Sequence, residues 1–232
     1  MNEKLAFLTC YFGGSNNYSR LIPPLPSTRY HCYFFTNDIE LYNSLDNTAW
    51  IRVLCDNRIH DCDLMDTMET KELRCCPHRF PALDKYEYLC WSDSKLLPYE
   101  DKVELLMSQL EGDNSKFIVL SKHPYSNTFN SVWDEFNLAI SSEKYGKQAQ
   151  QNTDYINRQI SNGFSEKIDI HFCGGWKLIK RCQMAKDFGD EWYSHVLECG
   201  IEDQISLSFI QQKYIEHIIP VEYQETWKYF YE

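Results

Sequence analysis

Asp93 is the residue whose position in the sequence most suggests chemistry. It follows the apolar run at 88–91, which is typical of a buried strand, and Ser92 and Lys95 stand beside it in a short polar segment. A carboxylate at a strand end can hold a divalent cation, and the cation can clamp a diphosphate. The alternative interpretation is a carboxylate that caps a turn.

Basic residues gather before that strand and after a later one. Arg74, His78 and Arg79 lie within six residues of one another. In an acidic chain they could form a phosphate-binding edge, or a surface cluster that balances nearby acids. Lys122 and His123 follow the apolar run at 117–120. His123 could bind a metal, donate to a phosphate or position an acceptor, and the alternative is a structural role.

Two further candidates come from the last third of the chain. Gly174 and Gly175 predict either a hairpin turn or a close approach of the backbone to a ligand such as a sugar. Asp203 begins a predicted helix, where it could be a cap. It could instead be a general base, held by the helix amides with one oxygen free.

Other patterns are less specific. Tyr11, Trp91, Trp133 and Trp176 could stack on a base or a sugar, although aromatic side chains of this kind usually belong to the core. A literal Asp-x-Asp at 61–63 has no strand before it, and we interpret it as solvated surface.

The candidates need strands and helices to bring them together. Apolar runs predict strands at 5–9, 31–36, 50–54, 86–91, 117–120, 168–173, 176–180 and 217–222. Helices are predicted near the end of 56–73, at 103–110, from 131 onward, at 191–198 and at 204–214, and the polar stretch 141–167 is expected to be partly helical or mobile. Strands that alternate with helices predict an α/β domain with a largely parallel sheet. Ligands of such sheets bind beyond the carboxyl ends of the strands, where Gly13-Gly14, Asp93 and His123 stand.

Length, composition and charge set limits on the class of protein. The 232 residues suit a single domain over 1–232, and 43% hydrophobic residues exclude a disordered chain. A net charge of -11 argues against a general nucleic-acid binder, because such proteins need a basic face. The sequence shows no apolar stretch of transmembrane length and no signal peptide, so we expect a cytoplasmic protein.

The 10 cysteines show no Cys-x-x-Cys pair and no regular framework. Several stand inside apolar runs, which indicates buried, reduced thiols. A zinc site at Cys75, Cys76 and His78 is the alternative, although the usual ligand spacing is missing.

Several segments occur in an order that resembles a glycosyltransferase-like domain family of plant pectin and mucilage proteins and of viral and bacterial glycan enzymes. That family has a basic residue, then Pro-His, then Tyr-Asp-Tyr, then an aromatic strand that ends in Asp-Gly-Asn or Asp-x-Lys. The corresponding segments are Arg74-Cys75-Cys76-Pro77-His78-Arg79-Phe80, Tyr86-Glu87-Tyr88 and Trp91-Ser92-Asp93-Ser94-Lys95-Leu96. Later strands and a helix start match at Phe117 to His123, Gly174 to Ile179 and Glu202 to Leu207.

The resemblance implies a GT-A fold, with a mixed, mostly parallel central sheet flanked by helices. It implies a glycosyltransferase, either a hexosyl- or a pentosyltransferase, that moves a sugar from a nucleotide-diphosphate sugar to a hydroxyl of a glycan or glycoprotein. Uridine diphosphate is expected by analogy with the fold.

The resemblance also implies roles for individual residues. The nucleotide would be lined by Thr9, Tyr11, Phe12 and Asn37, and approached by Arg74 and His78. The metal, ribose or diphosphate of the donor would be held by Ser92, Asp93 and Lys95. The sugar or the acceptor would face His123, Gly174, Gly175 and Trp176. Asp203 would be the base of an inverting transfer.

The departures from the family pattern concern the metal. The usual Asp-x-Asp motif is reduced to Asp93-Ser94-Lys95, and Asn37 replaces an aspartate of the family. The metal at Asp93 would be Mn²⁺ or Mg²⁺, and Lys95 could make it dispensable by neutralising the diphosphate itself.

Two other functions compete with this one. The missing second carboxylate favours a catalytically idle module that binds nucleotides or glycans. A nucleotidyltransferase needs a glycine-rich basic loop after the first strand, but the loop at Gly13-Gly14 has no basic residue before Arg20.

Overall fold

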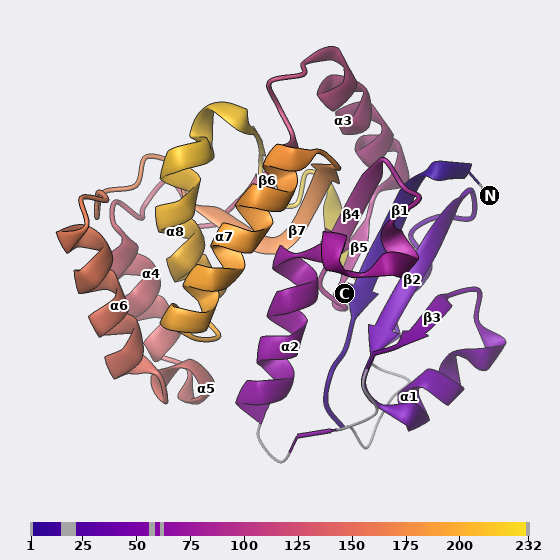
Figure 1. Ribbon diagram of the computed structural model, residues 1–232, viewed down its shortest axis with the longest axis horizontal. Coiled ribbons are helices and arrows are strands. Elements are labelled where there is room, and N and C mark those ends of the chain that lie inside the picture. The colour runs from indigo at the N-terminus through magenta and orange to yellow at the C-terminus, as the bar shows by residue number, and fades with distance from the viewer. Residues whose placement is uncertain (1, 15–21, 56–58, 61–62, 231–232) are drawn as a thin grey trace.

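Seven strands form one mixed sheet. The computed structural model describes residues 2–14, 22–55, 59–60 and 63–230 (Figure 1). The strands lie in the order β3-β2-β1-β4-β7-β6-β8. Their bounds are β1 (Asn2–Cys10), β2 (Tyr30–Thr36), β3 (Ile51–Leu54), β4 (Tyr88–Ser92), β6 (Ile118–Lys122), β7 (Phe172–Lys180) and β8 (Ile218–Val221). Neighbouring strands are parallel except where β7 pairs with β4 and β6, so the prediction of a mixed, mostly parallel sheet is confirmed.

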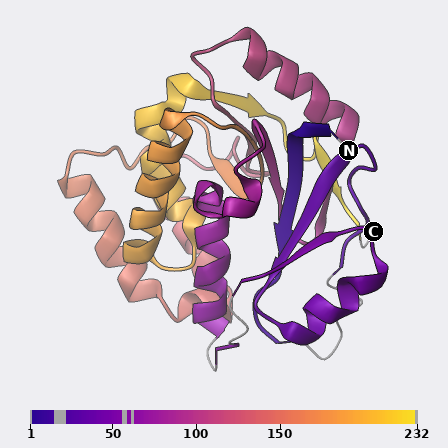
Figure 2. The ribbon, with the colours of Figure 1, turned by 45° about the vertical axis from the view of Figure 1, so that its right-hand side comes forward.

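Helices cover both faces of this sheet (Figures 1 and 2). One face carries α2 (Asp63–Cys75), α7 (Gln183–Cys199) and α8 (Asp203–Tyr214), and the other carries α3 (Glu100–Gly112). Alternate side chains of β1 therefore enter different clusters, Phe7 with Val103 of α3 and Leu8 with Leu73 of α2. Burial on both faces explains why the sequence of β1 is a continuous apolar run.

Three helices form an outer layer beside α8 (Figure 1). They are α4 (Val132–Ile140), α5 (Glu143–Gly146) and α6 (Ala149–Ser161). Val132 and Tyr155 pack with Phe209 of α8 in one buried cluster. The predicted capping of α4 is present, with Ser131 and Asp134 bonded reciprocally. The stretch 141–167 is partly helical, as expected.

One strand prediction is wrong. Gly174 and Gly175 do not form a hairpin turn between two strands, because β7 runs without interruption from Phe172 to Lys180. The irregularity is in the pairing: Leu120 of β6 pairs with Lys177, but the next residue, Ser121, pairs with Cys173. The glycines thus lie in a bulged part of one continuous strand.

Smaller elements complete the fold. The helix α1 (Ile39–Ser44) packs beside β3, and 3-10 turns occupy 45–47, 77–79, 81–83 and 215–217. β5 (Leu96–Pro98) and β9 (Trp227–Tyr229) form a separate two-stranded sheet. The aromatic segment of β9 therefore packs on its own chain, and Trp227 is buried.

The cysteine prediction is confirmed for the described residues. All nine cysteines there are free thiols, and all are buried except Cys55 and Cys182. The Asp-x-Asp at 61–63 falls mostly outside the described residues, apart from Asp63 at the start of α2. No helix within the described ranges is long and apolar enough to cross a membrane.

Candidate functional site

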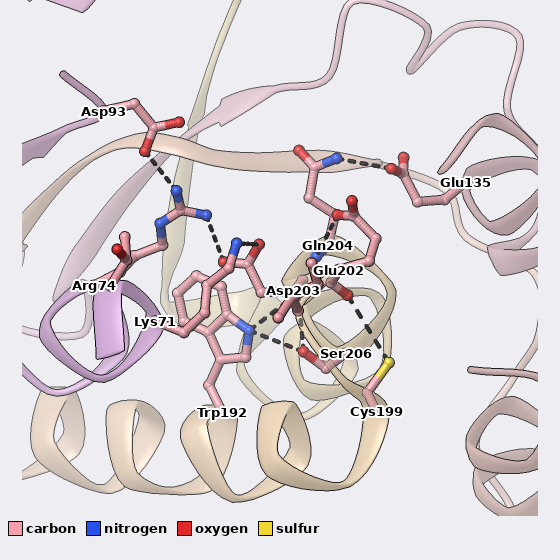
Figure 3. A network of polar contacts seen from close by, with 12 residues as sticks. Lys71, Arg74, Asp93, Glu135, Trp192, Cys199, Glu202, Asp203, Gln204 and Ser206 are labelled. Carbon is pink, nitrogen blue, oxygen red and sulfur yellow. Dashed lines mark hydrogen bonds and ion pairs between the residues drawn. The ribbon is translucent and has the colours of Figure 1, made fainter. Parts of the chain in front are cut away.

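Arg74 links two carboxylates from distant parts of the chain (Figure 3). Its Nη2 donates to Oδ1 of Asp93 at 2.5 Å, and its Nη1 donates to Oδ2 of Asp203 at 2.6 Å. Lys71 donates through Nζ to Oδ1 of Asp203, also at 2.6 Å. These residues come from α2, from the loop after β4 and from the start of α8. The fold thus assembles a charged cluster from segments up to 132 residues apart.

Burial and opposite charge act against each other in this cluster. Burial alone would lower the pKa of Arg74, but the carboxylates of Asp203 and Asp93 raise it well above its usual value. Burial alone would raise the pKa of Asp203, but Arg74 and Lys71 lower it below its usual value. Asp203 is therefore an ionised, 1% exposed carboxylate with a cation on each oxygen.

A buried lysine of β7 stabilises the last turn of α2. Lys71 and Arg74 are three residues apart, so they share one face of the helix. The buried Lys177 of β7 donates through Nζ to the backbone oxygen of Arg74 and lies 4.5 Å from the ring centroid of Trp192. Burial lowers the pKa of Lys177 to about 8. A carbonyl at a helix end lacks an intrahelical donor, and Lys177 supplies one.

The two glycines of β7 leave room for this cluster. A Cβ on Gly174 would lie 3.4 Å from both Arg74 Nη1 and Asp203 Oδ2. A Cβ on Gly175 would lie 3.1 Å from Asp93 Oδ2. The Gly-Gly pair therefore lets the backbone of β7 come close to Arg74, Asp203 and Asp93. The sequence interpretation of a close approach had a ligand, such as a sugar, as the partner.

A cavity of about 740 Å³ opens on one side of the cluster. We call it the larger cavity. It is lined by residues 10–14 at the end of β1 and just after it, and by Ile59, His60, Asp66, Thr67, Thr70, Lys71, Arg74, Trp91, Asp93, Ser94, Lys95, Lys144 and Tyr145. Four of these are cations, namely Lys71, Arg74, Lys95 and Lys144. No carboxylate of the described residues lies within ion-pair distance of Lys95 Nζ, so this cation is available to an anion.

A second cavity of about 240 Å³ adjoins the larger one at the charged cluster. We call it the smaller cavity. It is lined by Lys71, Arg74, Asp93, Lys95, Leu96, His123, Pro124, Tyr145, Cys173, Gly175, Glu202, Asp203, Gln204, Tyr223, Trp227 and Tyr229. The two cavities share Lys71, Arg74, Asp93, Lys95 and Tyr145 as a common wall. A molecule that filled both would pass directly over the charged cluster.

A buried polar network supports the smaller cavity. Glu135 is 2% exposed and accepts from Gln204 Nε2 at 2.8 Å and from His171 Nε2 at 2.7 Å. His123 Nε2 lies 3.8 Å from the same carboxylate, and its Nδ1 accepts from the backbone N–H of Tyr125. That bond leaves the proton of a neutral ring on Nε2. Burial lowers the pKa of His123, so the ring is a neutral donor at physiological pH.

The surroundings of Asp93 fit an anion better than a divalent cation. One oxygen of Asp93 pairs with Arg74, and Lys95 follows two residues later. The neighbouring carboxylate, Asp203, has a cation on both of its oxygens. A hard cation needs several free oxygen ligands, which this arrangement does not supply.

Two other groups among the described residues could hold a metal ion. His60, Asp66 and Glu69 place one ligand atom each within 4.8 Å of the others, and two of them line the larger cavity. The two carboxylates suit Mg²⁺ or Mn²⁺, whereas the imidazole suits Zn²⁺ or iron, so the set does not select one metal.

Cys76, His78 and Asp190 form the second group. It differs from the zinc set that the sequence offered as an alternative, because it contains Asp190 and not Cys75. Arg79 donates to Asp190 Oδ1 at 2.7 Å, so that carboxylate already has a cation.

The structure brings most, but not all, of the sequence-predicted site residues together. The cavity linings include Tyr11, Phe12, Arg74, Asp93, Lys95, His123, Gly175 and Asp203. The linings do not include Thr9, Asn37, His78, Ser92, Gly174 and Trp176. Asn37 is buried and accepts from the N–H of Gly13, a lining residue of the larger cavity, at 2.9 Å. His78 instead contacts Asp190, 3.1 Å away. Trp176 is 0% exposed within the core, so it cannot stack on a sugar.

Sequence reasoning missed several lining residues. Lys71 could have been found, because it lies three residues before Arg74 on a predicted helix. Glu202 directly precedes the candidate Asp203, but the sequence pattern assigned no role to it. Three aromatic lining residues of the smaller cavity come from the last ten residues of the chain: Tyr223, Trp227 and Tyr229. No local pattern in the sequence connects them with Asp93.

The fold was compared with known proteins. No known protein family matches the sequence, and no curated protein is detectably similar to it. Mouse xyloside xylosyltransferase 1 is structurally similar, with a TM-score of 0.51 and 10% identity over 94% of this chain and 85% of that one. Core-mannan synthase A of Aspergillus fumigatus, solved with Mn and GDP, gives a TM-score of 0.52 and 10% identity over 99% of this chain and 75% of its own. With its seven-stranded, mostly parallel sheet and flanking helices, the chain shares the GT-A-like fold of these glycosyltransferases.

Proposed function

We propose that this protein is a glycosyltransferase that moves a sugar from a nucleotide-diphosphate sugar to a hydroxyl of a glycan or glycoprotein. The observation that carries the proposal is the common wall between the two cavities. One cavity is large enough for a nucleotide, the other is lined by polar and aromatic side chains, and the cations stand where they meet. A reaction that joins a sugar from one side to a hydroxyl from the other needs this arrangement.

The cations suit the leaving group. As the bond between the anomeric carbon and the diphosphate breaks, negative charge develops on the diphosphate and must be stabilised. Lys95 and Arg74 line both cavities and can donate to phosphate oxygens. We assign this role to them rather than to a metal at Asp93. Whether a divalent ion binds at His60, Asp66 and Glu69 is tested by the comparison with and without Mn²⁺ below.

The acceptor side is the smaller cavity. His123 presents a neutral ring, and Tyr229 presents an aromatic face of the kind on which sugars stack. We propose that these side chains position the acceptor. A UDP-sugar is the expected donor, and a GDP-sugar is the first competitor to test, since the fold is shared with a GDP-bound enzyme. The single-domain organisation and the cytoplasmic location stay predictions.

One observation favours a competing function, a catalytically idle module that binds nucleotides or glycans. Both oxygens of Asp203, the expected base, already pair with cations. Donor hydrolysis separates the two functions, because an idle module releases no nucleoside diphosphate.

The test is thermal unfolding with UDP, GDP, UDP-glucose, UDP-xylose and GDP-mannose, each with and without Mn²⁺. A ligand at ~100 times its dissociation constant adds about 2.7 kcal/mol of stability. That shifts the melting temperature of a chain of this size by about 5 to 11 °C. We expect one nucleotide to give this shift without metal. A shift that occurs only with Mn²⁺ would mean that a metal ion, and not Lys95 and Arg74 alone, binds the diphosphate.

A matched pair of variants checks the location of binding. Lys95→Met should abolish the shift, whereas Lys102→Met, on the exposed face of α3, should retain it. No shift with any nucleotide for the wild-type protein would contradict the proposed function.

A further inference from the structure

Asp203 is poorly placed to take a proton. A general base needs an oxygen that can reach the acceptor hydroxyl, and a pKa near the working pH. Lys71 and Arg74 occupy the two oxygens of Asp203 at 2.6 Å each. These contacts suit a carboxylate that holds the two cations in place.

Glu202, the preceding residue, has the geometry that Asp203 lacks. Its Oε1 accepts from the backbone N–H of Gln204 at 3.2 Å, as the N-cap of α8. Its Oε2 accepts no hydrogen bond from any described residue. Glu202 is 7% exposed and lines the smaller cavity, as does His123. Figure 3 shows Glu202 beside Asp203 at the start of α8. One oxygen is therefore fixed by the helix, and the other is available to a molecule in the cavity.

We propose that Glu202, and not Asp203, is the catalytic base of the transfer. This inference rests on the proposed function and names the residue that accepts the proton. The acceptor oxygen forms a bond to the anomeric carbon while the bond from that carbon to the diphosphate oxygen breaks. The electron pair of the broken bond stays on the diphosphate. The hydroxyl proton moves to Oε2 of Glu202, which becomes a neutral carboxylic acid.

Titratable groups of five helices, its own α8 included, face Glu202. Lys71 of α2 favours its ionised form, while Asp203 beside it and Glu135 of α4 oppose that form. The thiol of Cys199 on α7 and the phenol of Tyr145 on α5 are also close, and both are neutral at physiological pH, because burial raises their pKa values. Burial, more than any of these charges, raises the pKa of Glu202 to about 8. A carboxylate with such a pKa is a much stronger base than a surface glutamate.

The experiment compares Glu202→Gln with Asp203→Asn. It measures release of UDP or GDP from UDP-glucose, UDP-xylose and GDP-mannose, with water or sodium azide as the acceptor. Water must lose a proton, whereas the azide anion has none to lose. We expect Glu202→Gln to lower the rate with water by about 100-fold or more, and azide to restore it. The wild-type rate with water should rise with pH until Glu202 is ionised, and Glu202→Gln should lose that rise.

Asp203→Asn should behave differently. Because Asp203 positions Lys71 and Arg74, its loss should weaken nucleotide binding and raise KM about 10-fold or more, while the rise of the rate with pH remains. Glu198→Gln, at an exposed ion pair with Arg158, is the matched control and should leave the rate unchanged. Glu202→Asp keeps the carboxylate and should retain part of the rate and its pH dependence, which covers the case in which Glu202→Gln fails to fold.

The outcomes separate the inference from the function beneath it. If the wild-type protein turns over a donor and Glu202→Gln does so within threefold, Glu202 is not the base and the proposed function stands. If Asp203→Asn loses the pH dependence and responds to azide, the base is Asp203. If the wild-type protein binds nucleotides but releases none with water or azide, the idle module is correct, and both proposals are overturned.

Discussion

Glu202 and Asp203 are adjacent carboxylates whose pKa values move in opposite directions. The two side chains share one helix start, so the sequence around them cannot explain the difference. Asp203 meets two cations, whereas Glu202 meets one more distant cation and two other carboxylates. The pKa of a buried group depends on desolvation and on neighbouring charge, and here the neighbours come from α2 and α4.

This difference predicts how stability depends on pH. The pKa of Glu202 rises from 4.5 to about 8 on folding, so the folded protein holds a proton that the unfolded chain releases. Its contribution to the free energy of unfolding is complete below pH 4.5 and is lost as the pH rises toward 8. Glutamine mimics the protonated acid and has no such loss. We therefore expect the stability gain of Glu202→Gln over wild type to grow between pH 5 and 8, measured by urea unfolding. A gain independent of pH would show that Glu202 is not protonated in the folded state.

The strand β7 shows what a single element contributes to the site. It runs antiparallel to both of its neighbours, its bulge brings Gly174 and Gly175 against the charged cluster, and Lys177 supports the end of α2. Its glycines are needed for close packing, since neither has a positive φ.

The glycines predict unequal effects of adding one methyl group. Gly175→Ala would place Cβ at 3.1 Å from Asp93 Oδ2, which is closer than ordinary contact, so Asp93 must move and its pair with Arg74 weakens. Gly174→Ala would place Cβ at 3.4 Å from its nearest atoms, which is tolerable. We expect Gly175→Ala to reduce UDP affinity about 10-fold and Gly174→Ala to change it less than threefold, measured by calorimetric titration. Equal affinities for both variants would argue that Asp93 does not position the nucleotide.

At the scale of the whole molecule, the two ends of the chain build different cavities. The segment after β1 lines the larger cavity, and the C-terminal segment through β9 lines the smaller one. Trp227 anchors that segment: it is 2% exposed and packs in the same core cluster as Phe7 and Val103. The C-terminal segment should therefore affect the acceptor side without affecting the nucleotide side.

Trp227→Ala tests this division. Removing a buried tryptophan typically costs about 3 to 5 kcal/mol of unfolding free energy, which urea denaturation would measure. The dissociation constant for UDP should stay within about threefold, because Trp227 does not line the larger cavity. Tyr229→Ala is the control for loss of an aromatic side chain that lines the smaller cavity. Because Tyr229 is only half-buried, this variant should lose much less unfolding free energy. A large loss of UDP affinity in Trp227→Ala would mean that the cavities do not act independently.

Local patterns in the sequence were sufficient for much of the fold. Apolar runs at 31–36 and 117–120 correspond to β2 and β6, and the helix predicted at 204–214 is α8. Such runs are informative because a strand buried on both faces must be apolar along its length. The hairpin at Gly174 was wrong because glycine permits both a turn and a close contact, and only the neighbouring elements decide between them.

The sequence by itself determined the mixed α/β class and placed Asp93, Lys95 and His123 after strands, because hydrophobic periodicity reports burial within each segment. Only the tertiary structure decided that Arg74 stands between two aspartates and that Trp176 lies in the core. It also decided that Glu202, which lines the smaller cavity, keeps one oxygen without a hydrogen bond from a described residue, while both oxygens of Asp203 pair with cations. The physical reason is that ion pairs, burial and pKa depend on which distant segments meet, and a local pattern carries no record of those partners.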